Sequence, residues 1–194
     1  MDVQVLKVTS ACFSTIRLLS RIKNFLETDQ LQLLVCSLVL SMLDYCNILY
    51  YGISAENISR LQRVQNSAAR LACKVNFFDR VSSEELFEKL HWLKVRERVA
   101  YKVLVTVHKC VYGNALDELV EMISFSQSNR TKKLEAKECI GEMGDRAFSV
   151  CGPRLWNALP HRLRLIDDED DFKAQIKTYL FKNADYFYET VHTK

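Results

Sequence analysis

Residues that end helices or form turns are scarce in this chain, which has only five glycines and two prolines among 194 residues. A protein built from many strands needs more turns than these can supply, so the composition favours helices. The chain is 48% hydrophobic and 26% charged, which allows a buried core and excludes wholesale disorder. The longest apolar run covers residues 33–43, whereas a membrane-spanning helix needs about 20 residues. We therefore expect a helical protein that does not span a membrane.

Cysteine pairs and metal-binding motifs are also absent. The seven cysteines lie at least ten residues apart, so there is no C-x-x-C pair. Their number is odd, and the first ten residues, MDVQVLKVTS, lack the apolar segment of a secretory signal. We interpret them as reduced core residues of an intracellular protein, either cytoplasmic or nuclear. No H-E-x-x-H motif and no glycine-rich phosphate loop occurs, so we expect neither a metal site nor a cofactor.

Candidate catalytic residues are equally few. Metal-dependent polymerases hold two divalent ions with closely spaced aspartates, but the only tight acidic cluster here, residues 167–171, precedes a predicted helix. Negative charge is favourable at a helix N-terminus, so capping explains this cluster. His91 and His108 stand beside apolar residues, as half-buried structural histidines do. We expect no enzymatic activity.

Apolar periodicity predicts a series of helices. The first covers residues 9–27, with Leu18, Leu19 and Ile22 on its apolar face. Thr28 and Asp29 are suitable caps for a second helix, which is apolar nearly all round and is therefore expected to be central. Further helices are predicted over residues 55–75 (capped by Ser54), 83–93, 94–113 and 115–123, and after residue 171, where Phe172, Ile176, Tyr179 and Leu180 form the buried face. Residues 124–143 have weak periodicity and predict a flexible connection.

Basic residues gather in the first part of the chain. Residues 1–112 carry a net charge of +5 and residues 113–194 a net charge of −2, which allows a nucleic-acid partner for the first part. Two of the predicted helices carry a basic face. Arg17 and Arg21 share a face of the first helix, and a face of the helix over residues 55–75 carries Arg60, Arg63, Arg70 and Lys74. Two interpretations stay open for each residue, a contact to phosphate or a solvated basic surface.

Both prolines fall in one segment, DRAFSVCGPRLWNALP, residues 145–160. Proline lacks an N–H and restricts the preceding residue, so Gly152-Pro153 is expected to interrupt the helical pattern and form a corner. Trp156 supplies apolar area to hold this corner in place. Arg154 and Asn157 could either cap exposed backbone groups or contact nucleic acid.

Several strings in the chain resemble a known protein family. They are SLVLSMLDYCNILYYGI, ISRLQRVQNSAARL, LHWLKVRERVAYKVLVTVHK, GDRAFSVCGPRLWNALPHRLR and FKAQIKTYLF. Together they resemble the C-terminal region of the reverse transcriptase of non-LTR retrotransposons (LINE-type, jockey-like elements), in the family's order and over most of residues 10–182. In that family an endonuclease and the polymerase palm precede this helical region. Both are absent here, and residues 130–143 look shorter and more charged than in the family.

The resemblance implies an all-α fold in which a thumb-like helical module, residues 1–78, packs with a helical C-terminal domain, residues 79–194. The thumb of such enzymes holds the template-primer duplex, so the implied partners are an RNA or DNA duplex and a reverse-transcriptase palm supplied in trans. The implied phosphate contacts, which position without reading sequence, are Arg17, Arg21, Arg60, Arg63, Arg70 and Lys74. Such a chain would be a truncated element copy or a host gene derived from one. The alternative is a protein-interaction or structural remnant with no nucleic-acid role.

Overall fold

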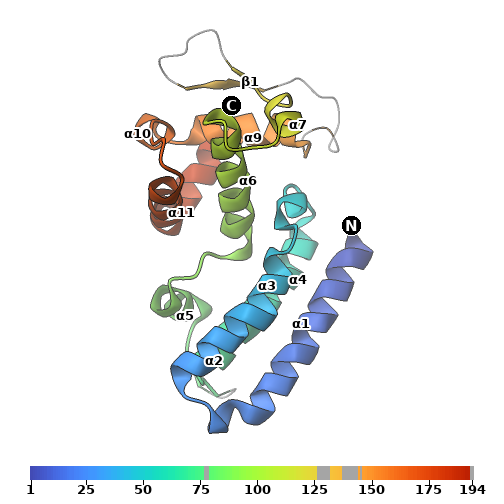
Figure 1. Cartoon of the computed structure of the whole chain (residues 1–194). Coiled ribbons are helices and arrows are strands. Elements are labelled where there is room, and N and C mark those ends of the chain that lie inside the picture. Colours follow the sequence, from blue (N-terminus) through green and yellow to red (C-terminus); the bar gives the residue numbers. More distant parts are fainter. Residues whose placement is uncertain (77–78, 126–131, 137–143, 145, 193–194) are drawn as a thin grey trace. The chain divides into compact units, whose positions relative to one another are not determined.

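Helices dominate the computed structural model, which describes residues 1–76, 79–125, 132–136, 144 and 146–192 (Figure 1). The chain divides into two compact units, Met1–Arg98 and Val99–Lys194. The strands found in the described residues are two short segments that form a two-stranded sheet. The predicted all-α class is therefore confirmed. No helix in the described ranges is both long enough and apolar enough to cross a membrane.

The first unit is built around two parallel helices, α1 (Asp2–Ile22) and α4 (Ala55–Ala72). Asn57, near the start of α4, donates a 2.5 Å hydrogen bond to Asp2 at the start of α1, and Lys74, after the end of α4, donates to the carbonyl of Leu26 beyond the end of α1. The sequence between α1 and α4 forms, in order, a 3₁₀ turn (Lys23–Phe25), α2 (Thr28–Val35), a π-helical turn (Cys36–Leu40), α3 (Ser41–Asp44) and a second 3₁₀ turn (Asn47–Tyr50). The helix α5 (Ser83–Leu90) follows α4.

The start and the buried face of α4 agree with the sequence pattern. The Ser54 hydroxyl accepts a 3.4 Å hydrogen bond from the backbone N–H of Asn57, as an N-cap does. The apolar stripe of α4 is buried, with Leu61, Val64, Ala68 and Leu71 in the core.

The first helix differs from its prediction in both extent and phase. It begins at Asp2 instead of residue 9, and its buried residues are Val5, Thr9, Cys12, Ile16 and Leu19. Leu18 and Ile22, which were expected on the buried face, are exposed. The earlier start adds Val5 to a buried stripe that continues through Cys12 and Ile16, so the buried face points away from Leu18.

The second helix, which was expected to be central because it is apolar nearly all round, is buried on only part of its surface. Its N-cap is Glu27, which forms a capping box with Gln30, and helical structure ends at Asp44 after the π-helical turn. Leu31 and Val35 are buried, but Leu33 is 68% exposed and Leu38 is 46% exposed. Apolar composition alone does not reveal on how many sides a helix is packed.

The first compact unit extends to Arg98, whereas the sequence analysis places the boundary after residue 78. Three contacts tie the later residues to the earlier helices. Gln65 on α4 donates a 2.7 Å hydrogen bond to the carbonyl of Leu93, and the side chain of Gln62 accepts one from the backbone N–H of Val95. The Arg98 guanidinium binds both carboxylate oxygens of Asp44.

The second unit contains most of α6 (Val95–Val111), which crosses the division, and the remaining elements. These are α7 (Asp117–Val120), β1 (Ser124–Phe125), β2 (Leu134–Glu135), α9 (Phe148–Ala158), α10 (His161–Arg164) and α11 (Glu169–His192). Its core contains Trp156 and Phe172, whose ring centroids lie 5.7 Å apart. The buried face predicted for the last helix is confirmed, because Phe172, Ile176, Tyr179 and Leu180 are all buried.

The small sheet lies in the segment expected to be a flexible connection. Ser124 pairs with Glu135 and Phe125 with Leu134 in antiparallel register. The side-chain amide of Asn157 both donates to the Leu134 carbonyl (2.7 Å) and accepts from its N–H (3.0 Å). Asn157 thus bonds to the backbone, as one of its two interpretations expected. Residues 126–131 and 137–143 of the predicted connection lie outside the described residues.

The expected break at Gly152-Pro153 is wrong, because α9 runs through both residues. Pro153 is the sixth residue of the helix, where it removes the hydrogen bond to the carbonyl four residues earlier and its ring crowds that carbonyl. The surrounding core outweighs this loss, since Gly152, Pro153, Leu155 and Trp156 are all buried. Gly152 also permits close approach to α6, because a Cβ at this position would lie 3.0 Å from Cγ2 of Val107.

The cysteines and histidines follow their structural interpretation only in part, since Cys46 is exposed and two other described cysteines are half-buried. None of the six described cysteines forms a disulfide, and Cys12, Cys110 and Cys151 are buried. Burial raises the pKa of Cys12 and Cys151 to about 11. His108 is fully buried instead of half-buried. His91 is exposed instead of half-buried, and it ends α5 in a left-handed conformation (φ 51°).

Candidate functional site

The parallel pair α1 and α4 carries long stretches without acidic residues. Residues 3–26 contain four Lys or Arg and no Asp or Glu, and residues 57–78 have the same composition. Acidic side chains occur only at the starts of the two helices, at Asp2 and Glu56. The positive electrostatic potentials of neighbouring helices add, and a surface of positive potential attracts a polyanion.

Three of the six predicted contact residues are exposed and available. Arg17 and Arg21 lie one turn apart on α1, and Arg63 lies on α4. Arg21 and Arg63 make no hydrogen bond or ion pair with the side chains or backbone of any described residue. Among the described residues, Arg17 has one hydrogen-bond partner, the Ser14 hydroxyl, at a long 3.3 Å on the surface.

The other three predicted contacts are engaged within the protein. Arg60 forms an ion pair with Glu56 on the same helix. Arg70 donates to three backbone carbonyls of the loop after α4, at Asn76 (2.6 Å), Asp79 (3.0 Å) and Val81 (3.1 Å). Lys74 donates to Leu26 at 2.5 Å. The continuous basic stripe predicted along α4 is therefore interrupted, because Arg70 and Lys74 donate hydrogen bonds to backbone carbonyls of the same unit.

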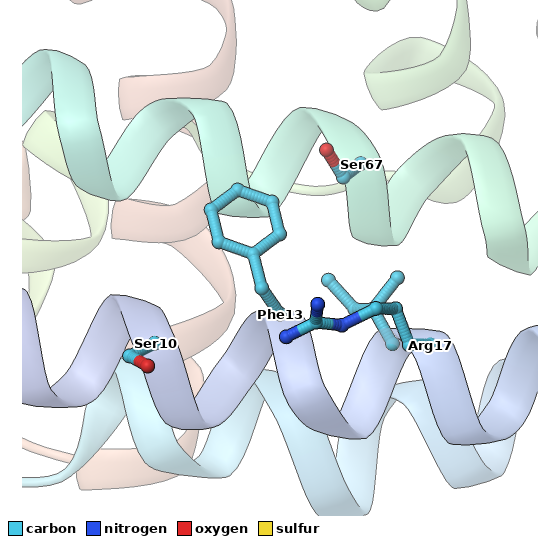
Figure 2. A pocket seen from close by; sticks show the side chains of 5 residues that line it. Ser10, Phe13, Arg17 and Ser67 are labelled. Atoms are coloured by element: carbon cyan, nitrogen blue, oxygen red, sulfur yellow. The ribbon is translucent and has the colours of Figure 1, made fainter.

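A hollow of about 470 Å³ lies between α1 and α4, beside the exposed arginines. It is lined by Ser10, Phe13, Ile16 and Arg17 from α1 and by Ser67 from α4 (Figure 2). Ser67 stands one turn after Arg63, and its hydroxyl donates to the Arg63 carbonyl at 3.0 Å. The sequence pattern does not indicate Phe13, Ser10 and Ser67. A correct phase for α1 would have placed Phe13 at the edge of its buried face.

The acidic segment at residues 167–171 caps the start of α11 and forms ion pairs there. The Asp168 carboxylate accepts a 2.7 Å hydrogen bond from the backbone N–H of Asp171, in the manner of an N-cap. Glu169 binds Lys173 at 2.7 Å and Lys109 at 3.1 Å, and these hydrogen bonds lower the pKa of Glu169. Within the described part of the chain, no three His, Cys, Asp or Glu side chains are grouped so that they could hold a metal ion.

Comparison with known proteins adds no relative to this picture. No family model, no curated protein and no solved structure matches this chain.

Proposed function

We propose that the first compact unit binds nucleic acid through phosphate contacts and catalyses no reaction on it. The observation that carries this proposal is the pairing of two acid-free helix stretches that present Arg17, Arg21 and Arg63 to solvent. Arginine suits phosphate because its planar guanidinium offers paired donors. Contacts of this kind give affinity and register without sequence preference.

The resemblance to retrotransposon reverse transcriptases supports the choice of partner. In that family the thumb holds a template-primer duplex, so an RNA or DNA duplex is the proposed ligand. The contact set is narrower than the sequence predicts, because Arg70 and Lys74 bond to backbone carbonyls of the same unit. A nucleic-acid partner would place the chain in the cytoplasm or the nucleus.

The test is a salt titration of duplex binding by the full chain. Each phosphate contact releases counterions, so the logarithm of affinity falls with the logarithm of salt concentration by about 0.9 per contact on B-DNA. We expect Arg17→Gln, Arg21→Gln and Arg63→Gln each to reduce this slope by about one contact, equally for unrelated sequences. Arg162→Gln, at an exposed position of α10 in the second unit, is the matched control and should leave the slope unchanged.

Two results would contradict the proposal. One is a wild-type chain that binds no duplex at low salt. The other is a set of slopes that Arg17→Gln, Arg21→Gln and Arg63→Gln leave at the wild-type value.

A second candidate is a protein-interaction surface, supported by the apolar side chains that α1, α2 and the π-helical turn expose. These are Leu18, Ile22, Leu33 and Leu38. Exposed apolar area marks protein contacts when it is contiguous and large. The partner by resemblance would be a reverse-transcriptase palm. This candidate predicts a chain without affinity for duplex whose binding to a palm, followed by sedimentation, is lost in Leu33→Asn.

A further inference from the structure

The hollow between α1 and α4 combines features that a phosphate contact alone does not require. Arg17 supplies a cation, Ser10 and Ser67 supply hydroxyl groups, and Phe13 supplies an aromatic ring. Its volume of about 470 Å³ falls within the range of small-molecule sites, which is about 300–1,000 Å³. A surface that only neutralises phosphates needs neither the ring nor the hollow.

Phe13 is the informative residue of this group. The buried stripe of α1 runs through Cys12, Ile16 and Leu19, and Phe13 stands at its edge with 37% of its surface exposed. Figure 2 shows its ring projecting from α1 towards α4, in the space where the hollow lies. An aromatic ring that is partly open beside a cation is a stacking platform for a flat ligand.

The position of Arg17 relative to this ring suggests which flat ligand fits. Arg17 follows Phe13 by one turn of α1, and Figure 2 shows both side chains reaching into the same space between the helices. A nucleotide joins a flat base to a phosphate, so one nucleotide can engage both side chains. The Ser10 hydroxyl can donate to or accept from its sugar or base edge, and the Ser67 oxygen, whose proton is donated to the Arg63 carbonyl, can accept.

A duplex cannot use this arrangement, because its bases are stacked inside and only its backbone faces outward. A ring held in a hollow reaches a base only when that base is unstacked. We infer that the hollow binds one unstacked nucleotide of a single-stranded segment, with its base on Phe13 and its phosphate on Arg17. This inference rests on the proposed phosphate binding by the first compact unit and adds a single-stranded segment to the duplex as a ligand of the same surface.

The test compares single-stranded oligo-thymidylate with a DNA hairpin duplex at one salt concentration, using the full chain and Phe13 variants. Phe13→Leu keeps the apolar contacts of the side chain but removes the flat face, and Phe13→Tyr keeps the flat face. We expect Phe13→Leu to weaken oligo-thymidylate binding at least fivefold. This is the lower end of the effect of losing one stacked base, since a tenfold change in affinity corresponds to about 1.4 kcal/mol. Hairpin affinity and both salt slopes should stay at wild-type values, and Phe13→Tyr should bind like wild type.

The outcomes separate this inference from the proposed function. If Phe13→Leu binds oligo-thymidylate as wild type does while Arg63→Gln lowers the salt slope, the nucleotide site is wrong and phosphate binding stands. Equal losses for oligo-thymidylate and hairpin in Phe13→Leu would also overturn the site, because a stacked base distinguishes the two ligands. A wild-type chain that binds neither ligand at low salt contradicts both.

Discussion

The ammonium group of Lys74 donates a 2.5 Å hydrogen bond to the backbone carbonyl of Leu26, 48 residues earlier. Lys74 follows the end of α4 in a left-handed conformation (φ 53°), and Leu26 lies in the connection between α1 and α2. The bond therefore fastens the C-terminal ends of the two parallel helices. A lysine that the sequence pattern offers as a phosphate contact has a structural role instead.

Lys74→Met should consequently lower the free energy of unfolding and leave nucleic-acid binding intact. We expect a loss of about 1–2 kcal/mol, towards the low end for hydrogen bonds of charged groups, because Lys74 is half-buried. Urea denaturation followed by circular dichroism measures this. Arg63→Met is the matched control, since an exposed side chain typically changes stability by no more than about 0.5 kcal/mol. Equal stability of the two variants would show that the Lys74–Leu26 bond contributes nothing.

The sequence predicts local features well and tertiary partners poorly. Ser54 and the stripe that contains Leu61 and Val64 could be assigned because capping and 3.6-residue periodicity depend on neighbours in the chain. The roles of Arg70 and Lys74 could not, because the carbonyls they bind are brought near by folding. Spacing on a helix shows which side chains share a face and leaves open what that face meets.

The same limit explains the errors at α2 and α9. Leu33 is apolar but 68% exposed, because apolar composition does not determine which side of a helix is packed. Pro153 continues a helix because the core around it, including Trp156, outweighs one lost hydrogen bond. The hollow at Phe13 could not be predicted from the sequence, because it is formed by the packing of α1 beside α4.

Trp156→Ala should destabilise the protein by about 3–5 kcal/mol, the usual cost of truncating a fully buried aromatic residue. The indole packs on Phe172, and its N–H donates a 2.7 Å hydrogen bond to the carbonyl of Lys132. Trp156→Phe leaves that carbonyl without its donor but keeps an aromatic ring in the core. Its loss of stability should therefore be smaller than that of Trp156→Ala. Thermal denaturation measures both. Nucleic-acid affinity, measured well below the melting point, should barely change, and intact stability with lost binding would show that Trp156 lies on a contact surface.

His108 should make the stability of the protein depend on pH. Its Nε2 lies 2.9 Å from the carbonyl oxygen of Ile166 and therefore carries the proton, while its buried Nδ1 has no hydrogen-bond partner in the described ranges. A second proton would be placed on a buried nitrogen without an acceptor. Burial lowers the pKa of His108 below its ordinary 6.5, an effect that the Ile166 carbonyl and nearby acidic groups only partly offset.

Because the folded pKa lies below the unfolded value, the unfolded state binds more protons in this range. Stability is therefore fully present above about pH 6.5 and is lost as the pH falls from there through the folded pKa, by at most about 1.4 kcal/mol per pH unit. Urea denaturation between pH 7.5 and 5.5 measures this loss. His108→Gln should remove most of it, whereas His161→Gln, at an exposed position, should retain it. A wild-type stability that is constant over this range would contradict the prediction.

The purified chain should not extend a primer in the presence of nucleotides and magnesium. Nucleotide transfer of this kind requires carboxylates that hold two divalent ions. The clustered acids at residues 167–171 instead serve α11, with Asp168 at its start and Glu169 bound to two lysines. A gel-based extension assay with a template-primer duplex tests this. Template-dependent incorporation that persists after re-purification, and that is lost in Asp168→Asn with Glu169→Gln, would contradict the prediction.

Gly152→Ala should have opposite effects in two backgrounds. In the wild type, the added Cβ would lie 3.0 Å from Cγ2 of Val107 and 3.5 Å from the Phe148 ring. Val107 is fully buried and branched at Cβ, so its side chain has little freedom to move aside. Overpacking of this kind costs about 1–3 kcal/mol, which exceeds the gain of about 1 kcal/mol from replacing glycine within a helix. We therefore expect a net loss of stability.

In a Val107→Ala background, the atom that the new Cβ would meet is gone, and only the helix-propensity gain remains. There Gly152→Ala should stabilise the protein by up to about 1 kcal/mol. A double-mutant cycle by urea denaturation measures the difference, which is the coupling between the two positions. Gly113→Ala provides the control, because Gly113 has φ +80° with open space at its Cβ position, so its strain should be the same in both backgrounds. If Gly152→Ala has the same sign with and without Val107, the close approach of α9 to α6 does not explain the glycine.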